Sequence, residues 1–413
     1  MDVIITDHHH EPLELPKVFA IINPQLAAEK YPFKYLAGCG VAYKLAQAVI
    51  KKSKDLSPEA LPEGWEKWLL DLVAIGTIAD LQPVLGENRV LVKYGLVVLQ
   101  KTKRLGLLKL IEKMSSNLTK IDERVVGWQI CPRLNAAGRL NHASSAYQLL
   151  ITDDPAEAER LATELNQTNK QRQQLTDKIY NEAKQVLGKV DDQKILVAIG
   201  KEWPTGVVGL IAGRLTDEFY RPSLVISHYK GEIIGSGRSI EEFNIIEAVE
   251  KCDQFLSRYG GHAQACGFTL KSNKDLIRFV EEMTTLAEKE LTDKELLPTI
   301  RIDAEVKLED VNWELFEELE KFIPYGEDNP KPLFLAKDLT IVEMQTLGQD
   351  GKHLRLMVKH NTPIIRKTIG FCFGDWCAKL KNGDKIDMLF EVDINEWNGN
   401  RELQLKIIDL KIK

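Results

Sequence analysis

A long polar segment, residues 155–187, limits the folds that this sequence can adopt more than any other feature. Its pattern is helical, and Asp154 followed by Pro155 suits the cap and the first turn of a helix. About thirty residues with a rise of 1.5 Å each form a rod of roughly 45 Å. A polar rod of this length suits a connector between domains better than a core helix. We therefore expect separate folded domains before and after it.

The connector and a second boundary at Pro298 divide the 413 residues into the parts of a multidomain α/β protein. We predict a partial parallel-sheet domain over residues 1–150, the connecting helix over 151–190, a second α/β domain over 191–297 and an OB-type β-barrel over 298–413. The second domain is predicted from strand candidates at 195–199, 224–227 and 232–235 around a helix at 206–219.

The barrel is predicted from several short strand candidates separated by turn residues, with a hairpin signal at residues 395–400. Phe322 and Tyr325, in the segment that leads into it, offer aromatic rings for unpaired bases, although packing in a core explains them equally well. The basic residues of this part that could contact a phosphate backbone are Lys352, Arg355, Arg366 and Lys367.

Composition narrows the choice of partners. The net charge is -6, so nucleic acid would have to bind in local basic grooves. The six cysteines include no Cys-x-x-Cys pair, which fits neither a disulfide framework nor a zinc ribbon. No apolar run reaches the ~20 residues that span a bilayer, and the N-terminus does not resemble a signal peptide. We expect a cytoplasmic protein with reduced, mostly buried thiols and no membrane partner.

A short β-branched run at the start of the chain, residues 3–6, predicts a buried parallel strand. Asp7, His8 and His9 follow it directly. The carboxyl edge of an open α/β sheet is where ligands bind. There, one imidazole can bind a metal, its neighbour can serve phosphate or proton transfer, and the aspartate can orient them. The alternative interpretation is a surface stretch or the remnant of a tag.

A second apolar run, residues 69–77, predicts another strand, and Asp80 follows its end. If both strands belong to one parallel sheet, Asp80 and His8 face the same crevice. A carboxylate is the hard oxygen ligand that Mn²⁺ and Mg²⁺ prefer. The two runs therefore predict a divalent-metal site at the edge of the sheet.

Further motifs carry groups suited to phosphate. Residues 133–139, Arg-Leu-Asn-Ala-Ala-Gly-Arg, place forked guanidinium donors around small residues, although a plain helix face can show the same pattern. Residues 235–239, Gly-Ser-Gly-Arg-Ser, predict a loop able to grip a terminal phosphate. A Gly-Gly-His sequence ending at His262 is a weaker signal, because a structural histidine explains it better when it stands alone.

Taken in order along the chain, these motifs resemble those of the RecJ exonucleases, which belong to the DHH superfamily. The resemblance rests on the segments 3–10, 21–24, 36–42, 75–80, 86–89, 133–139, 235–239 and 259–263, and it covers essentially the whole chain. It implies a DHH phosphoesterase domain before the connecting helix, a DHHA1 domain after it and an OB domain at the end.

The resemblance also implies a function and roles for single residues. The protein would be a metal-dependent exodeoxyribonuclease that hydrolyses single-stranded DNA from its 5′ end with two Mn²⁺ or Mg²⁺ ions, in recombination and repair. A single-strand-binding protein and a repair helicase would be partners. The implied residues are the metal ligands His8 and Asp80, the catalytic His9 with Asp7 beside it, Arg133, Asn135 and Arg139 on nucleic acid, Ser236 and Arg238 on the 5′ phosphate, and His262 on a substrate phosphate.

One part of the family's pattern is missing from the sequence. RecJ proteins carry an Asp-x-Asp pair and a further aspartate before the Asp-His-His motif, whereas six residues precede Asp7 and no Asp-x-Asp occurs in this chain. The expected two-metal site is therefore incomplete, because each divalent ion wants about six ligands. We expect a chain that is truncated at its N-terminus and inactive alone, whether it is a fragment, a mispredicted start or half of a split gene.

Two other functions fit part of the sequence. One is a DHH/DHHA1 phosphodiesterase for short oligonucleotides or cyclic dinucleotides, but such proteins usually end after the Gly-Gly-His domain, and residues 299–413 follow it here. The other is a nuclease-inactive scaffold that binds single-stranded DNA. The missing aspartates favour the scaffold, whereas the retained His8, His9 and Asp80 oppose it.

Overall fold

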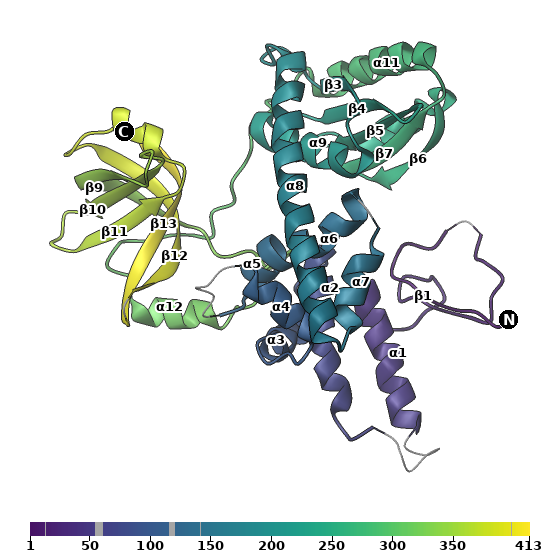
Figure 1. Ribbon diagram of the computed structural model, residues 1–413. Helices are drawn as coiled ribbons and strands as arrows, with labels where there is room; N and C mark the ends of the chain where they lie inside the picture. The colour runs from purple at the N-terminus through teal and green to yellow at the C-terminus, as the bar shows by residue number, and fades with distance from the viewer. Residues whose placement is uncertain (13, 54–60, 115–119, 141, 398) are drawn as a thin grey trace. The chain divides into compact units, whose positions relative to one another are not determined.

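The computed structural model describes residues 1–12, 14–53, 61–114, 120–140, 142–397 and 399–413 (Figure 1). These residues form two compact units. The first unit joins the two ends of the chain, Met1–Gln100 and Ile300–Lys413, and the second is the continuous stretch Lys101–Thr299. None of the helices formed by the described residues has the length and apolar character needed to cross a membrane.

The N-terminal part of the first unit contains a small parallel sheet and several helices. Its main elements are β1 (Ile4–Thr6), β2 (Ala20–Ile22), α1 (Gly38–Ser53), α2 (Leu70–Ala79) and α3 (Gly86–Leu99). β1 and β2 pair in parallel. The helices approach one another where glycines face a neighbour, since a Cβ on Gly76 would lie 2.5 Å from the Cys39 sulfur and one on Gly95 would collide with the Leu70 carbonyl. Close packing of α1, α2 and α3 is thus built into the sequence.

The structure corrects one predicted element in this part. Residues 69–77 were expected to form a strand, but the chain forms helix α2 over Leu70–Ala79. The helix is buried on several sides, with Val73 and Ala74 almost inaccessible to water. Such an apolar run shows no periodicity that separates a buried helix from a buried strand. Asp80 therefore stands at the C-terminal end of a helix rather than at the edge of a sheet.

The C-terminal part of the first unit is a closed β-barrel, which confirms the predicted OB-type fold. Its strands are β9 (Phe334–Leu347), β10 (His353–Lys359), β11 (Ile365–Gly370), β12 (Lys385–Trp397) and β13 (Asn400–Ile412). They pair in the order β9-β10-β11-β13-β12 and close through β12 and β9, with β11 and β13 parallel. The short strand β8 (Ala304–Glu305) and helix α12 (Trp313–Glu320) precede the barrel. A closed Greek-key barrel of five strands is the OB architecture.

The second unit combines a group of helices with a mixed sheet. The helices before the sheet are α4 (Leu105–Glu112), α5 (Glu123–Val125), α6 (Cys131–Leu140), α7 (Ser144–Ile151) and α8 (Pro155–Leu187). The sheet region contains β3 (Leu196–Lys201), α9 (Thr205–Phe219), β4 (Ser223–Tyr229), β5 (Glu232–Arg238), α10 (Ile245–Glu250), β6 (Leu256–His262), β7 (Ala265–Leu270) and α11 (Asn273–Leu291). The strand order is β3-β4-β5-β7-β6, and β3 and β4 are parallel.

Helix α8 has the bounds that the sequence predicts for the connector. The Asp154 carboxylate accepts a hydrogen bond from the Ala156 amide, and Pro155 occupies the first turn. The helix contacts α4, α6 and α7, and it also contacts α9 and β3 (Figure 1). Apolar residues such as Leu161 and Ala183 are buried along it. The helix therefore connects the two parts of the second unit and also belongs to the core of each.

Candidate metal and phosphate sites

The first site lies in the first unit, where β1 ends. The Nε2 atom of His8 lies 2.9 Å from the Oδ2 atom of Asp80, and these side chains are 17% and 43% exposed. Gly38, the first residue of α1, leaves room for the imidazole, because a Cβ there would lie 3.2 Å from the Nδ1 atom of His8. The structure thus brings the two predicted metal ligands together, one from the end of a strand and one from the end of a helix.

Asp7 and His9 complete this site. The Oδ1 atom of Asp7 accepts hydrogen bonds from the backbone amides of His8 and His9, and it lies 2.8 Å from the Nδ1 atom of His9. The hydrogen bond to the His9 ring is the main cause that holds the pKa of Asp7 below its usual value. The buried Asn23, which follows β2, donates to the His9 carbonyl at 2.8 Å. Both the aspartate and the second strand therefore hold the histidines in place.

The donor atoms of this site fit a hard divalent ion in type and spacing. Neighbouring ligands of an octahedral ion with bonds of about 2.1 Å stand about 3 Å apart, and the His8 and Asp80 donor atoms are 2.9 Å apart. Within the described parts of the chain, Asp7, His8 and His9 also form a group whose ligand atoms all lie within 4.8 Å of one another. An ion that wants about six ligands would take the rest from water or other groups.

The second site lies in the second unit, on the mixed sheet. Residues 235–239 were expected to form a loop, but the chain as far as Arg238 belongs to strand β5. Glycine is required at two positions of this strand, since a Cβ on Gly235 would collide with the Phe268 ring and one on Gly237 would lie 2.6 Å from the Ile245 side chain. Because side chains alternate along a strand, Ser236 and Arg238, which follow these two glycines, share the other face.

Arg238 and Ser236 pack together on that other face, against α9. The Nη1 atom of Arg238 donates to the Ser236 hydroxyl at 3.2 Å, and this hydroxyl donates to the Cys266 carbonyl at 3.0 Å. On α9, a Cβ at Gly209 would lie 3.1 Å from the Ser236 Oγ atom and 3.2 Å from the Arg238 Nη2 atom. Burial lowers the pKa of Arg238. A guanidinium withdrawn from water in this way is stabilised by a bound anion.

Arg139, near the end of α6, joins the same region. Its Nη1 atom donates to the Gly206 carbonyl at 3.1 Å, and a Cβ on Gly206 would collide with the Arg139 carbonyl. Burial, followed by the positive charge of Arg238, lowers the pKa of Arg139. Pro204 precedes α9 and makes no side-chain cap, so the amides of the first turn add positive potential. The start of α9 and these two arginines therefore form a candidate phosphate site.

The other predicted phosphate residues are placed differently. Arg133 donates from its Nε atom to the Asn166 side chain on α8 at 3.0 Å and from its Nη1 atom to the Gln129 carbonyl at 2.8 Å. Asn135 is exposed on α6, and His262 is exposed at the end of β6. Arg133 therefore joins two helices, whereas the other two side chains lie at the surface.

Two residues that the sequence analysis did not select belong in this account. Arg172 on α8 has a pKa lowered by burial and by the charge of Arg139, and it donates to the Asn169 side chain at 2.7 Å. Nothing in the polar sequence of α8 distinguishes it from its neighbours. Trp128 is 82% exposed in a π-helical turn directly before α6. An aromatic residue beside the Arg133 motif was the signal that could have found it.

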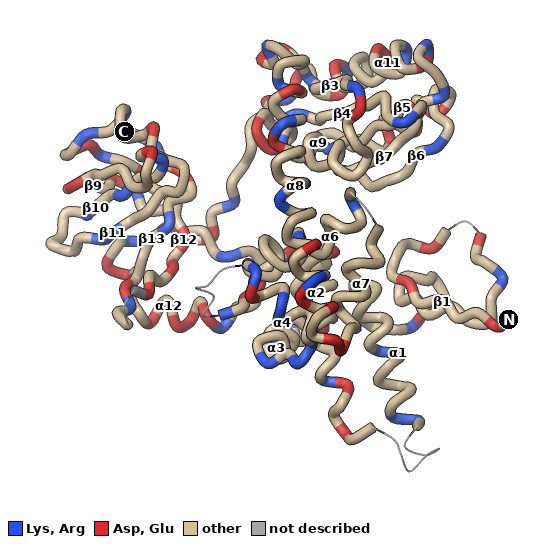
Figure 2. Tube along the Cα trace, in the orientation of Figure 1, with Lys and Arg blue, Asp and Glu red and all other residues tan. Residues whose placement is uncertain are grey.

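The barrel holds the basic residues that were expected to bind DNA, but most of them have partners within the protein. Arg355 pairs with Glu343 at 3.6 Å, and Lys367 pairs with Glu402 at 3.0 Å. Arg366 donates to two backbone carbonyls that precede α12. Figure 2 shows both signs of charge along the strands of the barrel. Its described strands therefore carry mixed charge rather than a uniformly basic face.

Comparison with known proteins identifies the class of protein that this fold and these sites define. Three family models match successive parts of the chain: the DHH family, N-terminal domain, over residues 1–77, the DHHA1 domain over 192–289 and the RecJ OB domain over 302–409. His8, Arg238 and the barrel each lie in a different one of these parts. The chain is thus of the DHH/DHHA1 class and carries an OB module.

Curated relatives narrow this class to one family. The chain is 38% identical to the single-stranded-DNA-specific exonuclease RecJ of Bacillus subtilis over all of its own length and 51% of that protein. It is 33% identical to RecJ of Escherichia coli over 98% of its own length and 72% of that protein. The chain belongs to the RecJ family of single-stranded-DNA-specific exonucleases. It spans about half the length of the Bacillus subtilis relative.

Solved structures agree with this assignment. RecJ from Thermus thermophilus in complex with Mn²⁺ is similar with a TM-score of 0.85 and 30% identity, over 100% of this chain and 58% of that one. The complex of the same protein with Mg²⁺ has a TM-score of 0.80 and 29% identity, over 99% of this chain and 59% of that one. The predicted fold class, an α/β chain with DHH, DHHA1 and OB parts, is confirmed.

Proposed function

We propose that the protein is a single-strand-specific DNA exonuclease that removes nucleotides from the 5′ end with Mn²⁺ or Mg²⁺. The observation that carries the proposal is the 2.9 Å approach of the His8 Nε2 atom to the Asp80 carboxylate, in a chain of the RecJ family. The relatives described above are single-stranded-DNA-specific exonucleases, and the solved relatives are complexes with Mn²⁺ or Mg²⁺. Both facts support the same chemistry for this protein.

His8 and Asp80 would hold a divalent ion, with Asp7 and His9 next to it. A bound ion would polarise a phosphoryl oxygen and lower the pKa of a water molecule. His9 would face the scissile phosphate with its Nε2 atom, because its Nδ1 atom lies against the Asp7 carboxylate at 2.8 Å. Asp7 favours the tautomer with the proton on Nδ1 and keeps the ring in one orientation.

The second unit would hold the end of the strand. Ser236 and Arg238 would bind the 5′ phosphate with Arg139 beside them, since these groups gather at the start of α9. Asn135 and His262, which are exposed, would contact phosphates farther along the strand. Arg133 would act indirectly, by joining α6 to α8. This arrangement supports a preference for a phosphorylated 5′ end.

The family also supports a proposal for the wider biological role. The OB module would bind the single strand behind its end, chiefly by stacking, because most of its basic side chains are paired. We place the protein in DNA recombination and repair, with a single-strand-binding protein and a repair helicase as partners. Its location would be the cytoplasm. We also propose domain boundaries near residues 150, 190 and 297, which limited proteolysis would test.

The proposal is tested with oligothymidylate that carries a label and a 5′ phosphate. We expect the 413-residue chain to bind this strand but to hydrolyse it slowly, because the described side chains around His8 supply fewer ligands than a divalent ion wants. Any Mn²⁺-dependent products should be mononucleotides from the 5′ end, and His9→Ala should abolish them. Products released from the 3′ end, or hydrolysis that His9→Ala leaves unchanged, would contradict the proposal.

Binding of single-stranded DNA without cleavage is the second candidate function, and the small set of metal ligands favours it. It predicts equal affinity of the chain and of His9→Ala for oligothymidylate, with no hydrolysis at any Mn²⁺ concentration. This alternative would be excluded if, at millimolar Mn²⁺, the unsubstituted chain released 5′ mononucleotides and His9→Ala did not.

A further inference from the structure

The loop that follows Asp80 is short and strained. It joins the end of α2 to Gly86, the first residue of α3. Its first residue, Leu81, has a φ of 52° and is 71% exposed. A branched side chain in left-handed backbone is unfavourable and persists only where the surrounding structure holds it. The position of Asp80 therefore depends on what holds this loop.

Two contacts from α2 and α3 hold the loop. The Gln82 amide donates to the Thr77 carbonyl on α2 at 3.2 Å. On α3, the Nδ2 atom of Asn88 donates to the Pro83 carbonyl at 3.1 Å and to the Tyr35 carbonyl at 2.6 Å. Asn88 is fully buried. These bonds join the loop to its own helices and to the segment before α1.

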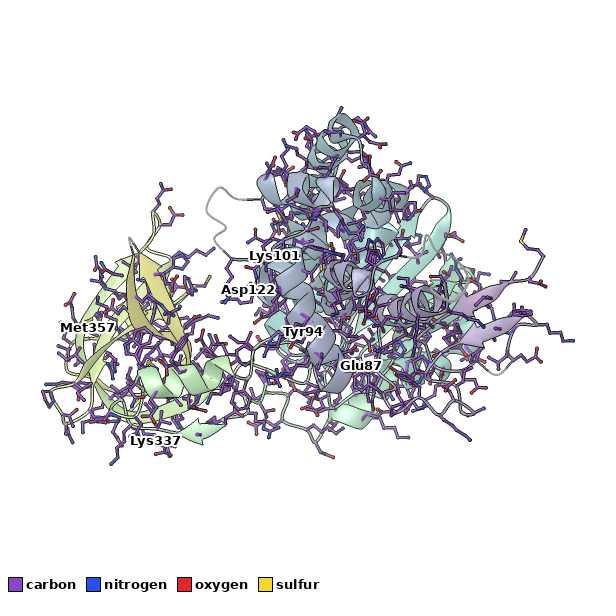
Figure 3. The ribbon with its side chains drawn as sticks, turned by 90° about the horizontal axis from the view of Figure 1, so that it is seen from below. Glu87, Tyr94, Lys101, Asp122, Lys337 and Met357 are labelled. Carbon is purple, nitrogen blue, oxygen red and sulfur yellow. The ribbon has the colours of Figure 1, made fainter. Side chains whose placement is uncertain are left out.

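The neighbour of Asn88 strengthens the same end of α3. Glu87, which Figure 3 labels on this helix, accepts a hydrogen bond from the Tyr31 hydroxyl at 2.7 Å and forms an ion pair with Lys44. Gly86 has a φ of 49°, and a Cβ there would lie 2.9 Å from the Phe33 ring. The residues at the start of α3 thus stabilise its contacts with α1 and with the segment before α1.

A third contact comes from the other end of the chain. The Val84 amide, in the middle of the loop, donates to the Glu327 carbonyl at 2.8 Å, and the Val84 side chain is buried. Gly326 faces this side chain so closely that a Cβ would lie 2.5 Å from it. One turn farther along α3, the Nη2 atom of Arg89 donates to the Lys321 carbonyl at 2.6 Å. The segment before the barrel therefore contacts the loop at Val84 and the start of α3 at Arg89.

Residues 322–329 of this segment form a turn that is held by several hydrogen bonds. We call it the linker turn. The Asn329 side chain donates to the Phe322 carbonyl at 3.0 Å and to the Pro324 carbonyl at 2.8 Å. Gly326 and Asn329 also exchange backbone hydrogen bonds of 3.0 and 3.1 Å. The Tyr325 hydroxyl donates to the Leu319 carbonyl at 2.7 Å. A turn with this many internal bonds can impose its shape on the partner that it contacts.

We propose that the linker turn, with Arg89, positions Asp80 opposite His8. It does so by holding Val84 and thus the strained backbone between Asp80 and α3. Gly326 and Arg89 are positioning residues in this sense, because they contact Val84 and Lys321 and belong to neither the proposed metal site nor the proposed phosphate site. The inference rests on the proposed function for the role of Asp80 as a metal ligand. It gives the segment before the barrel a role at the metal site in addition to the stacking on bases that its aromatic residues suggest.

The test compares variants of the 413-residue chain by amide hydrogen exchange and by Mn²⁺ titration, with the free ion followed by electron paramagnetic resonance. Gly326→Ala introduces the methyl group that Val84 cannot accommodate, and Arg89→Ala removes the bond to Lys321. Arg89→Lys keeps one donor. Lys93→Ala is the matched control, because it removes a positive charge from an exposed position of the same helix. None of these changes alters a proposed metal ligand.

We expect Gly326→Ala and Arg89→Ala to speed amide exchange over residues 80–86 at least about tenfold. Both should weaken Mn²⁺ binding by about tenfold, which is the usual effect of removing a group that orients a ligand. Arg89→Lys should restore most of both properties, and Lys93→Ala should change neither. If Gly326→Ala fails to fold, the three other variants decide the question.

The inference is overturned if residues 80–86 exchange at the unsubstituted rate in Arg89→Ala, or if they exchange faster while Mn²⁺ affinity stays the same. Failure of the proposed function looks different. An unsubstituted chain that binds no Mn²⁺ would refute the metal site, and exchange alone would then decide whether the linker turn holds the loop. His8→Ala separates the two ideas further, since it should abolish Mn²⁺ binding and leave exchange over residues 80–86 unchanged.

Discussion

The candidate metal site and the candidate phosphate site are built in opposite ways. At the metal site, His8 and Asp80 come from the end of a strand and the end of a helix, and Asp80 is 43% exposed. At the phosphate site, Ser236 and Arg238 belong to β5, which is hydrogen-bonded to β4 on one side and β7 on the other. The metal site depends on two chain segments that converge, whereas the Ser236 and Arg238 part of the phosphate site depends on the interior of a sheet.

Because of this difference, we expect substitutions to affect metal binding and DNA binding independently. Converging segments shift when a single contact is removed, whereas a central strand keeps its side chains in register with its neighbours. The Arg238 guanidinium is already held against the Ser236 hydroxyl at 3.2 Å, so that site is preorganised for an anion before DNA arrives. We therefore expect metal binding to be sensitive to local change and DNA binding to be robust. The following predictions test that contrast.

Removal of a metal ligand should have the largest effect and should affect only one of the two sites. We expect Asp80→Ala and His8→Ala to weaken Mn²⁺ binding more than about a hundredfold, because loss of an orienting partner alone costs about 10–100-fold. Affinity for oligothymidylate in the absence of metal should stay the same. Paramagnetic resonance and fluorescence anisotropy measure the two properties. His10→Ala serves as the control, and a parallel loss of DNA binding would show that the sites are coupled.

Salt should weaken DNA binding next most strongly. Four phosphate contacts, at about 0.7 each for a single strand, predict a slope of log K against log salt near -3, or a loss of roughly 60-fold between about 50 and 200 mM. The candidate contacts include Arg139, Arg172 and Arg238. Anisotropy at several salt concentrations measures the slope, and duplex DNA should bind less well. A slope near zero would show that the candidate phosphate site does not bind the DNA backbone.

Loss of Arg238 should weaken binding of a 5′-phosphorylated strand by about tenfold or more, since a hydrogen bond to a charged group is worth roughly 1.5–3 kcal/mol. A strand with a 5′ hydroxyl should bind Arg238→Ala almost as it binds the unsubstituted chain. Arg214→Ala on α9 is the matched control, because that arginine pairs with Asp177 instead. Equal affinity of Arg238→Ala for the two kinds of strand is expected, and a retained preference for phosphate would refute the assignment.

A single methyl group on α9 should have the smallest effect. We expect Gly209→Ala to weaken binding of the phosphorylated strand by about threefold, because its Cβ would lie 3.1 Å from Ser236 Oγ and force a small shift. Gly213→Ala should be neutral, since a Cβ there would lie 3.9 Å from the Arg238 side chain, an ordinary contact. Identical affinities of the two variants would show that the packing of α9 on β5 does not shape the site.

The sequence by itself determined the elements that depend on near neighbours. The capping Asp154 and Pro155 predict the start of α8, and short strand candidates separated by turn residues predict the barrel, because both signals are local. The spacing of the cysteines predicts free thiols, and the structure shows six of them, of which Cys131, Cys252 and Cys266 are buried. The order of the motifs along the chain also pairs His8 with Asp80, whose donor atoms lie 2.9 Å apart in the structure.

Only the tertiary structure decided where those side chains stand and what holds them. A continuous apolar run has no periodicity that distinguishes a buried helix from a buried strand, so residues 69–77 were predicted as a strand although they form most of α2. Glycines suggest a loop unless the side chains that fill their space are known, so the part of β5 that follows Gly235 was predicted as a loop. No local sequence pattern predicts the burial of Arg172 or the hydrogen bond from the Val84 amide to the Glu327 carbonyl. Such contacts join residues far apart in the chain, and packing rather than local preference selects them.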